Sequence, residues 1–407
     1  MSGDISGCGY GSPEADQILV PTSAGLRVYP LTQIFGLGKR TLRAAEGMGL
    51  APLHFITQRG PLQDGETVLD MRYDVRTIQI LLAETMSGRT SFWDRKWDWL
   101  DLLRPNRSFS GGAVTPLVYR KWLPGGKIER GTDLETTAGD DEVTSHSGRF
   151  VERGLTAGQS FIITSGADAN TYTIVSVPND YTVQLDTAMG ATATNVHWQY
   201  TRGRGIRDLN CLLAQGLDFP MSASGDPYYP SGYREALRFT AHDPFWYGVE
   251  QYETWAIPDN IGDLVFDGAG AWFGKTSGVG RWLFAISSVG ERVNTVYWGT
   301  VGAKPVITVT GPATNIVISN DTIGITIRMN YAIAMGETVT IDTLNITATN
   351  NLGANLLPYT SGDIASFMLS PPPQAPDRIN QIIVSFDGAD VGSNATMLWR
   401  NRYVGLQ

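Results

Sequence analysis

The chain has 407 residues, enough for two or three domains whose cores need no disulfide or metal to hold them. It carries 31 Lys and Arg against 40 Asp and Glu, a net charge of −9, which argues against a general nucleic-acid binder with a basic surface. With 46 Gly, 21 Pro and only 17% charged residues, the composition is typical of a turn-rich, mainly β protein.

The N-terminal stretch and the cysteines favour a protein made in a reducing cytoplasm. Residues 1–17 show no basic region followed by an apolar core, so we expect no signal peptide. The sequence contains no run of about 18 apolar residues, which excludes a membrane-spanning helix. Cys8 and Cys211 form neither a CxxC motif nor a disulfide framework, and we expect two unpaired thiols.

The segment Gly36–Arg40 (GLGKR) faintly resembles a phosphate-binding loop. The Walker spacing requires glycine where Gln33 stands and Ser or Thr where Arg40 stands, so the motif fails. We expect a turn with exposed cations instead.

A strand with two distinct faces is predicted after this segment. Four apolar residues alternate with four charged ones, and only a period of two places them on opposite faces. The apolar positions are Leu69, Met71, Tyr73 and Val75. The apolar positions then change from odd to even residue numbers. A bulge or tight bend is therefore expected near Arg76–Thr77.

A short helix is predicted next. Ser91 and Asp94 have the spacing of a capping box, and Pro105 ends the run. We expect the two tryptophans of one helical face to pack onto a sheet. The residues of that face are Trp93, Trp97, Leu100 and Leu103.

The segment 110–202 differs in character from its surroundings. It contains short alternating strands such as Tyr181–Leu185 and Val196–Tyr200, separated by turn signals such as Pro178–Asp180. We interpret it as an inserted small β-sandwich or barrel domain. The chain then returns to longer strands, and Leu237–Gly248 (LRFTAHDPFWYG) runs from a strand into a turn, because proline cannot donate to a sheet.

Several motifs, taken in order, resemble the siphophage distal tail protein family. In the first part they are QRGPxQDGxT from Gln58, LLRPNR ending at Arg107, and the DPFWYG turn. In the C-terminal third, GP at Gly311 precedes IxIxMxY from Ile325, GExVxIDT from Gly336 and a terminal WRNRY.

The resemblance implies a mainly β fold in three parts. Residues 1–109 and 203–248 would form a discontinuous, ring-forming β-sandwich with one short helix. Residues 249–407 would form a galectin-like β-sandwich, and 110–202 lies outside the family pattern.

The resemblance also implies a structural virion protein without catalytic residues, cofactor or metal. It would form a homohexameric ring at the distal end of the tail, after assembly in the cytoplasm of the host bacterium. Its partners would be the tail tube protein, a tail hub protein and a tail fibre or receptor-binding protein. DNA would pass through the lumen without specific binding, as the negative charge allows.

No catalytic constellation contradicts this interpretation. The four histidines are scattered, without HExxH or a Cys/His cluster. His242 precedes Asp243, but neighbours on a strand face opposite ways and do not form a catalytic pair.

The alternative function is an adhesion module that binds a host glycan. Three tryptophans in Gly-rich surroundings are candidates for stacking on a sugar or contacting a partner, although core packing is the more common role of such residues. They are Trp122, Trp272 and Trp282.

Overall fold

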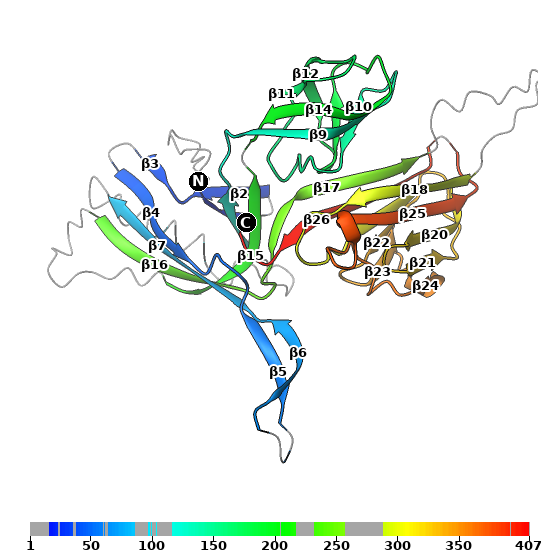
Figure 1. Ribbon diagram of the computed structural model, residues 1–407. Coiled ribbons are helices and arrows are strands. Elements are labelled where there is room, and N and C mark those ends of the chain that lie inside the picture. The colour runs from blue at the N-terminus through cyan, green and yellow to red at the C-terminus, as the bar shows by residue number, and fades with distance from the viewer. Residues whose placement is uncertain are drawn as a thin grey trace, which may run out of the picture.

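The computed structural model describes residues 16–22, 25–35, 38–59, 61, 64–85, 97, 99, 103, 116–203, 205–216, 232–256, 288–390 and 392–406. The predicted fold class is confirmed, because the described chain is mainly β. It folds into a large sheet, a five-stranded sheet, a closed barrel and a two-stranded hairpin (Figure 1).

The large sheet runs through both the N-terminal and the C-terminal parts of the described chain. Ten strands follow one another in the order β23-β22-β19-β26-β17-β15-β16-β7-β4-β3, and β8, β1 and β2 branch from β15. Its strands are β1 (Gln17–Thr22), β2 (Gly25–Pro30), β3 (Gln33–Phe35), β4 (Gly38–Glu46), β7 (Arg76–Thr85), β8 (Leu117–Trp122), β15 (Ile206–Gln215), β16 (Gly232–Ala241), β17 (Trp246–Ala256), β19 (Val306–Thr310), β22 (Thr338–Asp342), β23 (Thr347–Asn350) and β26 (Asn394–Tyr403).

The C-terminal part is a two-layer sandwich. One layer is the end of the large sheet, and the other has the strand order β18-β25-β20-β21-β24. Alternation along β19 and β26 buries one face of each strand against the second layer, as a period of two requires. The strands of the second layer are β18 (Ser288–Val296), β20 (Thr314–Asn320), β21 (Ile325–Met329), β24 (Thr360–Gly362) and β25 (Ile379–Asp387), and short 3₁₀ turns span Leu357–Tyr359 and Pro376–Arg378.

The N-terminal core lies where the large sheet folds over itself. Its buried residues come from β1, β7, β8, β15 and β16, and include Ile80, Tyr119 and Leu209. Trp246 of β17 and Tyr403 of β26 complete it, both fully buried. Thus the last strand contributes Trp399 to the C-terminal core and Tyr403 to the N-terminal core.

Six described strands of the middle segment close into a barrel in the order β10-β13-β12-β11-β14-β9. Four aromatic rings fill it, with neighbouring centroids 5.5–6.2 Å apart. They are Phe150, Phe161, Trp198 and Tyr200. A Cβ on Gly131 would lie 2.3 Å from the Trp198 ring, which explains why a glycine lies there. The strands are β9 (Ile128–Thr136), β10 (Glu142–Ser145), β11 (Ser160–Ile163), β12 (Asn170–Ser176), β13 (Thr182–Leu185) and β14 (Ala193–Thr201).

Two strands cross the limits expected for the domains. β8 lies within 110–202, yet it pairs with β1 and β15 of the large sheet. β17 begins at Trp246 in the N-terminal core and continues to Trp255 in the C-terminal core.

Three residues of the predicted helix are described, and they show a buried face other than the expected one. Trp97, Trp99 and Leu103 are helical, and the remaining residues of the predicted helix, including Trp93, lie outside the described residues. Trp97 is 58% exposed, whereas Trp99 and Leu103 are buried in the N-terminal core. The expectation that Trp97 packs onto the sheet is therefore wrong: Trp99 and Leu103, one turn apart, define the buried face.

The expected turn of exposed cations at Gly36–Arg40 is also wrong at Arg40. This residue lies in β4, is buried, and forms an ion pair with Glu84 of β7. Its guanidinium lies 4.5 Å from the ring centre of Trp99, which donates a hydrogen bond to the same carboxylate. The pair therefore fastens the helix to the sheet.

Within the part of the chain that the structure describes, no helix is long and apolar enough to cross a membrane.

Candidate functional site: a projecting arm and an interdomain groove

A two-stranded hairpin, here called the arm, projects from the body of the molecule (Figure 1). It consists of β5 (Leu53–Gln58) and β6 (Thr67–Tyr73), and no other described strand pairs with it. The break between the two alternating rows falls at Asp74–Val75, two residues before the expected position, and it separates β6 from β7. The single strand predicted from the alternation is therefore two strands in different sheets.

One face of the arm is apolar and open to solvent. Phe55 lies opposite Met71 and Leu53 opposite Tyr73, so these four side chains share one face. Their exposed fractions lie between 37% and 51%, and Leu69, at the register shift between the two strands, is 59% exposed. The other face carries His54, Asp70 and Arg72. An apolar row this exposed on a paired strand is typical of an interface.

The root of the arm is fixed by a buried arginine. Arg76, 1% exposed, donates to the carbonyl oxygen of Pro244 at 2.7 Å and to those of Gly47 and Gly49 at 2.8 Å. It also donates to the carbonyl oxygen of Val404. No carboxylate contacts it among the described residues, and burial lowers its pKa to about 10. The arm is therefore held by contacts with three distant parts of the chain.

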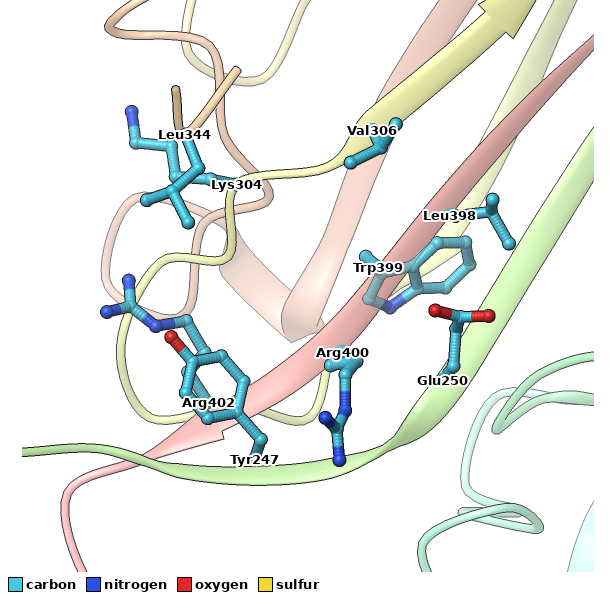
Figure 2. Close-up of a pocket in the computed structure, with 9 residues that line it drawn as sticks. All are labelled: Tyr247, Glu250, Lys304, Val306, Leu344, Leu398, Trp399, Arg400 and Arg402. Atoms are coloured by element: carbon cyan, nitrogen blue, oxygen red, sulfur yellow. The ribbon is translucent and has the colours of Figure 1, made fainter. Parts of the chain in front are cut away.

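A groove of about 250 Å³ lies where β17 and β26 run side by side (Figure 2). Its described lining is Tyr247, Glu250, Lys304, Val306, Leu344, Leu398, Trp399, Arg400 and Arg402. The lining combines apolar walls with three cations.

The cations of the groove are already paired. Arg400 donates to Asp208 at 2.8 Å, and Arg120 donates to both oxygens of the same carboxylate. Arg402 donates to Asp243 at 3.3 Å, and Lys304 to the carbonyl oxygens of Ala365 and Phe367. These contacts join the N-terminal and C-terminal parts, so the groove is a structural junction.

The described lining of the groove includes no Ser, Thr, Cys or His, and its one amine is Lys304. Burial lowers the pKa of Lys304 from its ordinary value and raises that of Tyr247 to about 12. Lys304 donates to the carbonyl oxygens of Ala365 and Phe367.

Of the three candidate tryptophans, one lies in the part of the chain that the structure describes. Trp122 ends β8, is half-buried, and its enclosed indole nitrogen has no hydrogen-bond partner among the described residues. Trp272, Trp282 and the cysteine Cys8 lie outside the described residues. Cys211 is a free, buried thiol.

The remaining candidate groups are dispersed. His242 is exposed, while Asp243 accepts hydrogen bonds from Tyr247 and Arg402. No group of three or more His, Cys, Asp or Glu side chains in the described chain is arranged to hold a metal ion.

Sequence reasoning missed the role of Arg76. The available signal was the change of the apolar positions from odd to even residue numbers beside Arg76. At such a break between two strands, a charged side chain can point into the protein. Its four acceptors are backbone atoms far away in sequence, and no side-chain pattern encodes them.

No model of a known protein family matches the chain, and no curated protein matches it by sequence. Among solved structures it is similar to the SPP1 Dit (gp 19.1) protein, described as a paradigm of the hub adsorption apparatus in phages that infect Gram-positive bacteria. That match covers 89% of this chain and 93% of the other, with 9% identity and a TM-score of 0.41. Similarity to the phage P2 baseplate in its activated conformation covers 94% and 97%, with 10% identity and TM-scores of 0.36 with calcium and 0.35 with strontium. With so few identical residues, no residue role is transferred from these structures.

Proposed function

We propose that this chain is a structural subunit of a siphophage tail tip. Six copies would form a ring at the distal end of the tail and join the tail tube to a hub protein and to tail fibres or receptor-binding proteins. The subunit would be non-enzymatic, bind no cofactor, and be assembled in the cytoplasm of the host bacterium. Its C-terminal sandwich would have the galectin-like topology of the family that the sequence resembles.

The observation that carries this proposal is the arm. Four apolar side chains lie on one face of a two-stranded sheet that no other described strand joins, and such a sheet is marginally stable in water on its own. A second copy of the chain is the occupant that we propose for this face. We propose that the arm of each copy contacts a different surface on the next copy, because repeating such a contact closes a ring.

The charge of the chain agrees with a lumen through which DNA passes. With a net charge of −9, the protein lacks the cationic excess that would retain phosphates.

The experiment is to compare the oligomeric state of the purified chain with that of two arm variants. Mass photometry and negative-stain imaging of the unaltered chain should show six-copy rings with an open centre. Phe55→Ser combined with Met71→Ser should give monomers, because it removes the apolar centre of the face. Arg72→Ser, on the opposite face of the same strand, is the matched control and should leave rings intact.

An unaltered chain that stays monomeric at high concentration would overturn the proposal. If rings persist in the Phe55/Met71 double variant, the ring stands but the arm does not form its interface.

Adhesion to a host glycan is the second candidate. It depends on Trp122, Trp272 and Trp282, of which only the half-buried Trp122 is described. We therefore rank adhesion below the structural role. If the unaltered chain binds purified cell-wall glycan and the Trp122→Ala variant does not, adhesion becomes the first candidate function.

A further inference from the structure

The barrel is joined to the rest of the chain by two neighbouring segments. Leu123 donates a backbone hydrogen bond to Gly205 at 2.8 Å, and Arg202 and Lys127 are linked at 2.7 Å. These segments lead out of β8 and into β15, which are themselves paired. The two connections lie at one place, beside the ion pair between Arg207 of β15 and Glu152 of the barrel, so the orientation of the barrel depends on a second contact elsewhere.

That second contact is made by the loop between β12 and β13. The Tyr252 amide donates to the carbonyl oxygen of Pro178 at 3.3 Å, and the Asp180 amide to Gln251 Oε1 at 3.1 Å. Tyr181 donates its hydroxyl hydrogen to Glu253. The barrel is thereby docked on β17.

Asp180 is at the centre of this contact and is fully buried. Its Oδ1 accepts the Glu152 amide at 2.7 Å. Its Oδ2 accepts the side-chain amides of Gln251 at 2.8 Å and Asn401 at 2.6 Å. The carboxylate thus joins the barrel to β17 and β26 at once.

No cation contacts Asp180 directly among the described residues. Arg149 and Arg207, the two nearby arginines, both donate to Glu152 instead. The titratable and charged groups near Asp180 are Glu152, Arg149, Arg207, Tyr200 and Tyr403, with Tyr181 and Glu253 further along the same contact. A buried carboxylate whose charge is met only by neutral donors is costly to ionise.

One atom of the contact is unpaired. Asn401 Oδ1 is buried and has no hydrogen-bond partner among the described residues. The 2.6 Å between Asn401 Nδ2 and Asp180 Oδ2 is also an ordinary O–H···O distance. If Asp180 is protonated, the Asn401 amide can turn over so that its Oδ1 accepts a hydrogen bond from the Asp180 O–H.

We propose that the docking of the barrel on β17 and β26 is a proton-operated latch, tightened when Asp180 takes up a proton and loosened when the proton leaves. The latch acts on the orientation of the barrel and does not depend on the ring.

The pH range follows from the carboxyl group. Burial and then repulsion by Glu152 raise the pKa of Asp180 from 3.8 to about 6 in the docked state. In the undocked state the group meets water, so its pKa falls toward the ordinary value. Because the docked state binds the proton more tightly, docking is strongest below pH 3.8 and weakens as the pH rises through about 6.

Hydrogen exchange on the full chain measures this latch. The Asp180 and Tyr252 amides bridge the contact, so their protection, corrected for the intrinsic exchange rate, reports how often the barrel undocks. Between about pH 8 and about pH 5.5 their protection should rise about fourfold, as linkage to a pKa near 6 requires. The Ile162 and Ile163 amides inside the barrel, which pair with Thr171 and Asn170 or with β14, should not follow.

Asp180→Asn keeps the size of the side chain and removes the titration. Protection of the two bridging amides in this variant should be independent of pH. Asp186→Asn, an exposed carboxylate on the same barrel, is the matched control and should retain the fourfold change.

Unchanged protection in the unaltered chain, or the same pH dependence in Asp180→Asn, would overturn the latch. Exchange of the Ile162 and Ile163 amides shows whether Asp180→Asn is folded. If it is not, the titration of the unaltered chain decides alone.

Discussion

The arm and the barrel are both made of β-hairpins, yet their aromatic and aliphatic side chains have opposite fates. In the barrel, Phe161 and Trp198 are almost completely buried, because six strands close around them. In the arm, Phe55 and Met71 are about half exposed, because two strands have no second layer. The same alternation thus produces a core in one region and an open face in the other, and the number of paired strands decides which.

The largest expected effect concerns the barrel, where the aromatic side chains are enclosed. Phe161→Ala should destabilise the barrel by about 3–5 kcal/mol, because it removes a ring that three other aromatics contact. Chemical denaturation followed by tryptophan fluorescence measures the loss. A change below about 1 kcal/mol would mean that the barrel core repacks, unlike a close-packed interior.

Arg76→Met tests how the root of the arm is held in place. It should cost about 3 kcal/mol of unfolding free energy, because the guanidinium donates to four backbone carbonyl oxygens and methionine donates to none. Differential scanning calorimetry is the measurement, and Arg72→Met on the exposed face of the arm is the control. Equal thermal unfolding midpoints for the two variants would show that the Arg76 hydrogen bonds do not stabilise the root of the arm.

Asp133→Asn probes the polar side of the barrel. Its carboxylate accepts hydrogen bonds from Ser145, from the amide and hydroxyl of Ser147, and from Trp198. The substitution should therefore cost about 1–2 kcal/mol at neutral pH.

The same residue adds a pH dependence. Burial acts to raise the pKa of Asp133, but these hydrogen bonds hold it below its ordinary 3.8. Its contribution is therefore present above pH 3.8 and lost as the pH falls through the lowered pKa. Acid denaturation of the unaltered chain should show this loss, and Asp133→Asn should not. Identical acid profiles would contradict the assignment.

The smallest expected effect returns to the arm. In a monomeric preparation, Phe55→Ser should change the unfolding free energy by less than about 0.5 kcal/mol, because the ring is already half exposed. The measurement is urea denaturation at a concentration where assembly is absent. A loss of 2 kcal/mol or more would show that Phe55 is covered within its own chain, and the contrast with Phe161 would disappear.

The alternation of residues identified strands but not what covers them. At Leu69–Val75 the period of two correctly predicts an apolar face, yet nothing local states that the strand leaves its sheet at Asp74. For the helix, the spacing of Trp93 and Trp97 fits one face, but the sheet selects the face of Trp99 through the Arg40–Glu84 pair. The local pattern limits which residues can be buried, and contacts with residues far away in the sequence decide which of them are.

The groove and the Asp180 contact were beyond sequence reasoning for the same reason. Arg400 meets Asp208 across 192 positions, and Asn401 meets Asp180 across 221. Such pairs arise from sheet register in three dimensions, which a single sequence does not display.

The last described strand has a consequence for how the protein is made. Tyr403 of β26 completes the N-terminal core, and the Val404 carbonyl receives Arg76 across 328 positions. A ribosome-bound chain therefore cannot finish its first domain until nearly all of the described sequence has emerged. The barrel, whose pairings are all internal, can close earlier. Folding of the N-terminal core should thus be slow, as such long loop closures demand.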